Sequence, residues 1–318
     1  MIEVINLTKR YGDKKAVDNI SFKAEDGEVL GFLGPNGAGK STTMNILTGY
    51  ISCTDGKALI DGVDILEDPV KAKKQIGYLP ELPPLYMDMT VKEYLYFVYD
   101  LKKCKLPKVS HLKDICGLVK IDHVYNRIIK NLSKGYKQRV GLAQAVLGFP
   151  EIIILDEPTV GLDPKQIIEI RELIRKLAKK HTVILSSHIL AEVREVCDYI
   201  MIISGGKLVA SDTTENLENM MSGKGQIEVE AKAPRDEMDH IIRRTGKIKE
   251  VKYRTSASGI TTAQIIAKGG EDIREELFLA FSHADVPMLT LNQSKTTLEE
   301  IFLELTQGSG NRMIKEEK

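Results

Sequence analysis

The sequence predicts an α/β domain built on a parallel sheet, followed by a smaller α+β domain. A short apolar run leads into the glycine-rich segment 34–41, and another apolar run ends in two carboxylates at 156–157. Up to about residue 200, runs typical of strands alternate with helical runs, as in parallel sheets covered by helices. Beyond residue 225 the expected order becomes βαββαβ, the split pattern of ferredoxin-like domains.

The N-terminal elements are expected to be short strands separated by turns. Apolar or alternating runs predict strands at 2–7, 20–24 and 28–33. A helical stretch at 42–47 follows the glycine-rich segment, and a strand pair is expected within 49–63. From about 90 to 147 the pattern is mostly helical, with an interruption at Leu106 and Pro107.

The alternation continues in the second half of the first domain. The pattern there predicts a buried parallel strand at 152–155, an amphipathic helix at 164–180, a strand at 182–186 and a helix at 189–196. After a linker at 222–225, the βαββαβ elements are expected at 226–231, 235–244, 248–254, 261–267, 273–284 and 287–292. A last helix at 297–305 would precede a polar tail.

Composition and charge narrow the class of protein. Of the 318 residues, 42% are hydrophobic and 28% are charged, which is typical of a globular protein. The 45 basic and 45 acidic residues cancel, which argues against a nucleic-acid partner bound through a basic surface. No stretch approaches the roughly 18 apolar residues of a membrane span, and the start does not resemble a signal peptide. The four scattered cysteines indicate neither a zinc site nor a disulfide framework, so we expect a cytoplasmic protein.

The glycine-rich segment matches the phosphate-binding pattern G-x-x-x-x-G-K-[ST] without a mismatch. Its residues are Gly34, Pro35, Asn36, Gly37, Ala38, Gly39, Lys40 and Ser41, with Thr42 continuing into the helix. Gly37 and Gly39 would let backbone N–H groups turn inward around a phosphate, where the helix dipole favours an anion. Lys40 would reach the β- and γ-phosphates, and the Ser41 hydroxyl would ligate Mg²⁺. The alternative is a glycine-rich turn with an incidental lysine, which seldom arises by chance in a chain of this length.

Two carboxylates follow the buried strand expected at 152–155. Asp156 is placed to reach Mg²⁺ through water, and Glu157 to accept a proton from an attacking water. Carboxylates often begin loops after buried strands, so this pair is informative only together with the phosphate loop. The sequence has neither a DxxG after a strand nor an NKxD for guanine, which argues against a GTPase.

Further motifs between and after these segments resemble those of ABC ATPases. Leu132-Ser133-Lys134-Gly135-Tyr136-Lys137-Gln138-Arg139 is similar to the family's signature LSGGQ-x-x-R, with Lys134 and Tyr136 as departures. Gly161-Leu162-Asp163-Pro164 is similar to its D-loop, and Ser186-Ser187-His188 to its switch histidine. Tyr11 lies where the family has an aromatic residue that stacks on adenine. Residues 1–222 therefore resemble an ABC transporter ATPase subunit.

The resemblance implies a P-loop NTPase core with an antiparallel β subdomain and a helical subdomain at about 82–150. An accessory α+β domain would occupy 225–307, and a polar tail 308–318. ATP and Mg²⁺ are the implied ligands. In this scheme Ser41, Asp156 and Glu81 hold the metal, and Glu157 and His188 are catalytic. Glu81 replaces the family's usual glutamine, as in a branch of bacterial exporters of drugs, polysaccharides and ions.

The resemblance also implies partners. Leu132, Ser133 and Gly135 of one chain would complete the nucleotide site of another, and Asp163 is the aspartate of the implied D-loop. The expected assembly is a homodimer, or a dimer with a sister ATPase subunit. Transmembrane permease subunits would hold it at the cytoplasmic face of the cell membrane, and no nucleic-acid partner is expected.

Each of the smaller motifs has a simpler alternative. Tyr11 could be a turn aromatic packed on the sheet, and Ser133 and Asp163 could serve only as helix caps. His188 could cap or pack against the helix that follows it. At the level of function, the alternatives are a soluble ABC-type ATPase acting on a ribosome or nucleic-acid complex and a nucleotide-sensing regulatory subunit.

Overall fold

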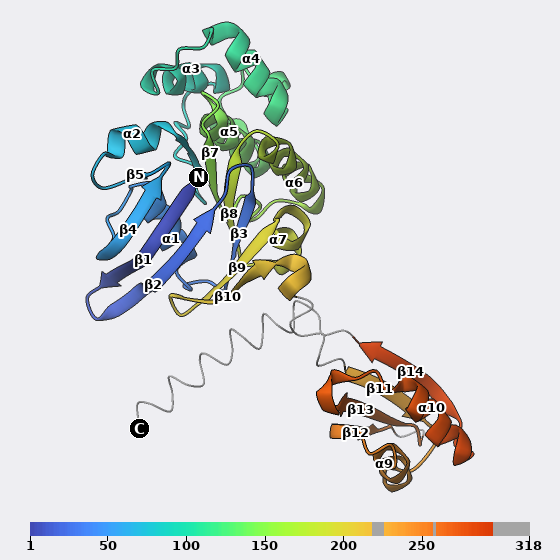
Figure 1. Ribbon diagram of the computed structural model, residues 1–318. Coiled ribbons are helices and arrows are strands. Elements are labelled where there is room, and N and C mark those ends of the chain that lie inside the picture. Colours follow the sequence, from blue (N-terminus) through green and yellow to red (C-terminus); the bar gives the residue numbers. More distant parts are fainter. Residues whose placement is uncertain (218–225, 257–258, 295–318) are drawn as a thin grey trace. The chain divides into compact units, whose positions relative to one another are not determined.

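The computed structural model describes residues 1–217, 226–256 and 259–294, which form two compact units (Figure 1). The first unit comprises residues 1–214, and the second begins at residue 215. The linker expected at 222–225, the last helix expected at 297–305 and the polar tail at 308–318 lie outside the described residues.

The first unit is organised around a six-stranded sheet with the strand order β10-β9-β3-β8-β7-β6. In chain order these strands are β3 (Val29–Leu33), β6 (Ile76–Leu79), β7 (Ile152–Asp156), β8 (Thr182–Ser187), β9 (Tyr199–Ser204) and β10 (Lys207–Thr213). Neighbouring strands are parallel except for β9 and β10. β3, β7 and β8 consist only of buried residues, as expected for parallel strands covered on both faces. The predicted α/β class is confirmed.

An antiparallel sheet with the order β2-β1-β4-β5 packs onto the same core. Its strands are β1 (Ile2–Tyr11), β2 (Lys14–Ala24), β4 (Asp55–Ile60) and β5 (Val63–Asp64). Phe22 of β2 meets Phe32 of β3 edge to face, with ring centroids 5.0 Å apart. Helix α1 (Lys40–Leu47) contributes Met44 and Leu47 to this core, so both sheets fix the position of the helix that follows the phosphate loop.

The helical part of the first unit begins with α3 (Val91–Leu101), α4 (Lys108–Val119) and α5 (Lys134–Val146), and α3 and α4 project beyond the sheets (Figure 1). Thr90 and Glu93 form a capping box at the start of α3, and Pro107 precedes α4 at the predicted interruption. The remaining helices are α2 (Pro69–Lys74), α6 (Pro164–Ala178), α7 (Leu190–Val196) and two short 3₁₀ turns at Asp122–Val124 and Ile129–Asn131. No helix in the described part of the chain combines the length and the apolar character needed to cross a bilayer.

Helix α5 leads into strand β7 through a short turn. Gly148 and Phe149 in this turn have left-handed backbones, with φ of 93° and 51°. Lys102 Nζ donates to the carbonyl oxygens of Gln144 (2.7 Å) and Leu147 (2.9 Å), which satisfies carbonyls at the end of α5. Loss of water around the ammonium group lowers the pKa of Lys102 to about 8, although the residue as a whole is exposed. The end of α5 is therefore held by α3 before the chain enters the central sheet.

Several elements differ from the prediction. The sequence did not indicate α2, β6, β9 or β10. β1 and β2 extend further than predicted because their polar ends pair across the hairpin, where Tyr11 lies opposite Lys14. Within 49–63, only β4 and the start of β5 are extended, and Gly49 has a φ of 63° at the end of α1.

The second unit contains β11 (Gln226–Ala231), α9 (Arg235–Arg243), β12 (Ile248–Thr255), β13 (Thr261–Ala267), α10 (Arg274–His283) and β14 (Met288–Ser294). These are the six elements expected from the sequence, in the expected order. The sheet has the strand order β12-β13-β11-β14, and every neighbouring pair is antiparallel. Met238 of α9 and Phe281 of α10 share a core with Val229 and Ile265 of the sheet.

Candidate active site

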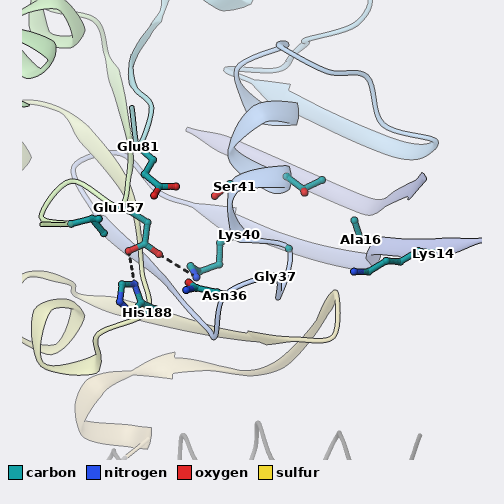
Figure 2. A pocket seen from close by; sticks show the side chains of 12 residues that line it. Lys14, Ala16, Asn36, Gly37, Lys40, Ser41, Glu81, Glu157 and His188 are labelled. Atoms are coloured by element: carbon teal, nitrogen blue, oxygen red, sulfur yellow. Dashed lines mark hydrogen bonds and ion pairs between the residues drawn. The ribbon is translucent and has the colours of Figure 1, made fainter. Parts of the chain in front are cut away.

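A cavity of about 520 Å³ opens where the central strands end (Figure 2). It is lined by Lys14, Ala16, Asn36, Gly37, Gly39, Lys40, Ser41, Thr42, Glu81, Glu157, Val160 and His188. Most of these residues follow the carboxyl ends of β3, β6, β7 and β8, which is where open α/β sheets bind ligands. The phosphate loop and the two catalytic candidates predicted from the sequence therefore lie in one cavity.

The phosphate loop needs glycine at particular positions. Gly37 and Gly39 have φ of 79° and 113°, in the left-handed region that glycine adopts without strain. A Cβ on Gly39 would lie 2.5 Å from the carbonyl oxygen of Ala16, and a Cβ on Gly34 would collide with that of Ile203. Gly39 has no side chain to cap α1, so the first N–H groups of the helix remain available to an anion.

Lys40 is the first residue of α1 and is 5% exposed. Its Nζ donates to the carbonyl oxygens of Gly34 (2.8 Å) and Pro35 (3.3 Å) and lies 3.2 Å from Glu157 Oε1. An ammonium group has three protons to donate. Two backbone carbonyls and the Glu157 carboxylate thus take the place that phosphate oxygens would have around Lys40.

Ser41 and Asp156 supply oxygen atoms beside this lysine. Ser41 Oγ donates to Asp156 Oδ1 at 3.1 Å, and Ser186 Oγ donates to the same oxygen at 2.5 Å. Burial raises the pKa of Asp156, because the loss of surrounding water outweighs the hydrogen bonds from the two hydroxyls. A hydroxyl and a carboxylate are hard ligands that Mg²⁺ accepts, and a cation here would offset the desolvation of Asp156. The donor set therefore fits Mg²⁺.

Glu157 links the phosphate loop to His188. Its backbone is left-handed, with φ of 48°, and its N–H donates to Ser186 Oγ at 2.9 Å. One carboxylate oxygen pairs with Lys40, and the other lies 2.9 Å from Nδ1 of His188 (Figure 2). The His188 side chain is 39% exposed, whereas that of Glu157 is 7% exposed. The imidazole therefore lies between the buried carboxylate and the solvent-filled cavity.

Other predicted site residues lie outside this cavity. Tyr11 ends β1 and is 53% exposed, with Lys9 Nζ 5.3 Å from its ring centroid. Ser133 is the N-cap of α5 but makes no side-chain capping bond. Asp163 caps α6 by accepting the N–H of Gln166 at 2.9 Å, as its simpler alternative predicted. Leu132, which precedes the N-cap of α5, is buried.

Gly135 lies in the first turn of α5, against α6. A Cβ on Gly135 would collide with the side chain of Gln166. The starts of α5 and α6 are therefore neighbours, and they form a second group of motif residues that does not line the chain's own cavity.

Sequence reasoning missed three lining residues: Lys14, Ala16 and Val160. Lys14 and Ala16 lie at the start of β2, in a stretch not expected to be extended. Ala16 takes part through its carbonyl oxygen beside Gly39, so its residue type gives no signal. The D-loop begins directly after Val160, which is the one cue that could have drawn attention to it.

Comparisons with known proteins agree on a family. The model of the ABC transporter family matches residues 17–160. The bacitracin transport ATP-binding protein BcrA of Bacillus licheniformis is 38% identical over 220 residues, which cover 69% of this chain and 71% of BcrA. The linearmycin resistance ATP-binding protein LnrL of Bacillus subtilis (strain 168) is 32% identical over 310 residues, which cover 96% of this chain and 98% of LnrL.

Solved structures agree with this result. The dimeric structure of MJ0796, a bacterial ABC transporter cassette, has 26% sequence identity and a TM-score of 0.62, and the match covers 67% of this chain and 98% of that one. A second structure of MJ0796, in a post-hydrolysis state bound to ADP and Pi, matches with 25% identity, the same TM-score and the same coverage. Sequence, fold and site geometry thus point the same way, and the chain belongs to the family of ABC transporter ATP-binding proteins.

Proposed function

We propose that this ATPase subunit powers export through a separate membrane-spanning permease. The convergence of Lys40, Glu157 and His188 on one cavity, with Asp156 hydrogen-bonded to the lining residue Ser41, supports ATP hydrolysis. The names of BcrA and LnrL, which concern bacitracin transport and linearmycin resistance, support export. Residues 1–222 would be the ATPase domain, and residues 225–307 an accessory domain.

The proposed reaction begins when the triphosphate of ATP enters the phosphate loop. Backbone N–H groups around Gly37 and Gly39 bind the phosphate oxygens, and Lys40 leaves Glu157 to neutralise the β- and γ-phosphates. Ser41, Asp156 and Glu81 would hold Mg²⁺, which would supply positive charge beside the phosphate oxygens. Tyr11 stacks on the adenine from the end of β1.

Glu157 and His188 then act at the γ-phosphate. Once Lys40 has moved to the phosphates, one oxygen of Glu157 is free to accept a proton from the attacking water. His188 remains hydrogen-bonded to the other oxygen, so it orients the carboxylate and places its ring near the leaving phosphoryl group. The Ser186 hydroxyl fixes the positions of the Asp156 carboxylate and the Glu157 backbone through its two hydrogen bonds.

The second group of motif residues completes the site in trans. Ser133 and Gly135 offer a hydroxyl, an N–H group and the positive end of the α5 dipole to the γ-phosphate bound by another chain. Leu132 anchors this segment, and Asp163 holds the start of α6 beside it. Two chains arranged head to tail would form two such sites, and hydrolysis would remove the contacts that hold them together.

The test compares oligomeric state and ATPase rate in the Glu157→Gln variant. Glutamine keeps the shape of the site but cannot accept a proton, so we expect hydrolysis to be lost and Mg-ATP to drive a monomer into a dimer in light scattering. Glu151→Gln is a matched control, because Glu151 precedes the other end of β7 and is exposed. A Glu157→Gln protein that hydrolyses ATP at the normal rate would overturn the assigned base.

The permease is tested in native membranes. Tagged Glu157→Gln protein with ATP should be retained on membrane vesicles from its own cells and released by ADP, and cells that lack the protein should accumulate the exported compound. Retention on ribosomes or nucleic acid in place of membranes would favour the soluble ABC-type ATPase instead.

A further inference from the structure

The signature segment of this chain carries a lysine, Lys134, where the family motif has a glycine. We propose that Lys134 is a further nucleotide-binding residue that acts in trans, with its ammonium group on the γ-phosphate of ATP held by a second copy of the chain. This inference rests on the head-to-tail dimer of the proposed function. It adds a charge to that interface which the signature motif itself does not contain.

Lys134 is the first residue of α5, and its side chain is exposed. The stem lies over Gly161 of the D-loop, so closely that a Cβ on Gly161 would collide with Nζ. Glycine is needed at position 161 for two reasons: its φ is 70°, which other residues seldom adopt, and a side chain there would collide with Lys134. The ammonium group therefore lies beside Gly161, close to the starts of α5 and α6.

The charge at this place has no counter-ion in the chain. Among the residues that the structure describes, Lys134 makes no hydrogen bond or ion pair. The first turns of α5 and α6 contain no acidic residue, and the carboxylate of Asp163 accepts the N–H of Gln166. A helix N-terminus carries partial positive charge, so a lysine there is unfavourable until an anion binds.

The neighbouring lysines differ from Lys134 in this respect. Lys130 Nζ lies 3.6 Å from Asp88 Oδ1, and Lys137 Nζ donates to the carbonyl oxygen of Lys130 at 3.2 Å. Both cations therefore have partners within the chain. Lys137, on the next turn of the same helix, is a matched control for Lys134.

The geometry points to an anion from outside the chain. Lys134 is not among the residues that line the chain's own cavity. It follows Ser133, whose hydroxyl is not used as a cap and is proposed to reach the γ-phosphate of the second copy. An ammonium group is a compact charge that suits a phosphate oxygen.

The experiment measures ATP-driven dimerisation in the Glu157→Gln background by sedimentation at 50 to 500 mM NaCl. Lys134→Met keeps the stem over Gly161 and removes the charge, and we expect it to raise the dimer dissociation constant by roughly tenfold, as for one charge-assisted contact. Salt should weaken the Lys134→Met dimer less than the parent dimer, because one screened attraction is missing. Lys134→Arg and Lys137→Met should behave like the parent. The affinity of the monomer for ATP should not change.

Each other outcome rejects the inference. A Lys134→Met dimer as tight as the parent shows that the charge has no role. Equal losses in Lys134→Met and Lys134→Arg show that the lysine acts by packing against Gly161. A loss of monomer nucleotide affinity shows that the residue does not act in trans. If the parent Glu157→Gln protein binds ATP but does not dimerise, the composite site of the proposed function fails, and this inference fails with it.

Discussion

Replacing Glu157 with glutamine should tighten nucleotide binding as well as block hydrolysis. Lys40 Nζ lies 3.2 Å from Glu157 Oε1, and the two side chains are only 5% and 7% exposed. A nucleotide must separate this pair before its phosphates reach the lysine. In the nucleotide-free chain, the Glu157 carboxylate thus competes with the phosphates of the nucleotide for Lys40.

The size of the competition follows from the geometry. Two unit charges 3.2 Å apart attract by roughly 5 kcal/mol at an effective dielectric constant of 20. Phosphate oxygens replace most of this attraction when the lysine moves. The net difference should therefore be about 1.5–3 kcal/mol, the range for hydrogen bonds to charged groups. This corresponds to a dissociation constant lowered by roughly 10- to 150-fold.

The assay is calorimetric titration with Mg-ADP. ADP has no γ-phosphate, so it reports the phosphate loop without the proposed dimerisation, and Glu151→Gln again serves as the matched control. The reasoning is refuted if Glu157→Gln binds ADP no more tightly than the wild type. A tighter Glu151→Gln would show that overall charge, not the Lys40 pair, controls the affinity.

Four further predictions concern the fold and the site. Ser186→Ala should lower the free energy of unfolding by about 1–3 kcal/mol in urea denaturation and slow ATP hydrolysis, because it removes one of the two hydroxyls that donate to Asp156 and takes away the buried acceptor of the Glu157 N–H; an unchanged midpoint would contradict this. Gly39→Ala should abolish ADP binding in the same titration, since the new methyl group meets the Ala16 carbonyl at a φ of 113°; normal affinity would show that the loop has another way to relax. Burial lowers the pKa of His111 and His181 below the ordinary 6.5, so the unfolded chain binds protons more readily and the melting temperature should fall as the pH drops below about 6.5. His111→Asn and His181→Asn should each reduce this dependence of the melting temperature on pH. An unchanged dependence in the double variant would show that neither histidine causes it. Truncation after residue 222 should leave Mg-ADP affinity unchanged, because every lining residue lies between Lys14 and His188; a folded truncation that no longer binds ADP would refute this.

The elements predicted well were those with strong local patterns. The amphipathic α6 buries the face that its sequence periodicity marks, and β7 is an unbroken apolar run that is buried on both faces. β10 was missed because most of its residues are only partly buried, so its side chains show no clear alternation. β6 was missed because four residues are too few to show a period.

The same distinction holds for the site. The phosphate loop could be predicted because its chemistry lies within eight consecutive residues. The pairing of Lys40 with Glu157 could not, since it joins residues 117 positions apart (157 − 40) and depends on how β3 and β7 lie in the sheet. Ala16 takes part through its backbone, and a backbone atom leaves no trace in the residue type.

The passage from α5 through the 148–149 turn into β7 connects the two proposed ATP sites mechanically. Ser133, which would contact another chain's nucleotide, stands at the start of a 13-residue helix about 20 Å long. The far end of that helix is clamped by Lys102, and β7 then ends at Asp156, beside the chain's own nucleotide. A displacement of the start of α5 would therefore be carried through the helix and β7 to Asp156. In a dimer this would couple the two ATP sites, so that hydrolysis at one site would depend on the state of the other.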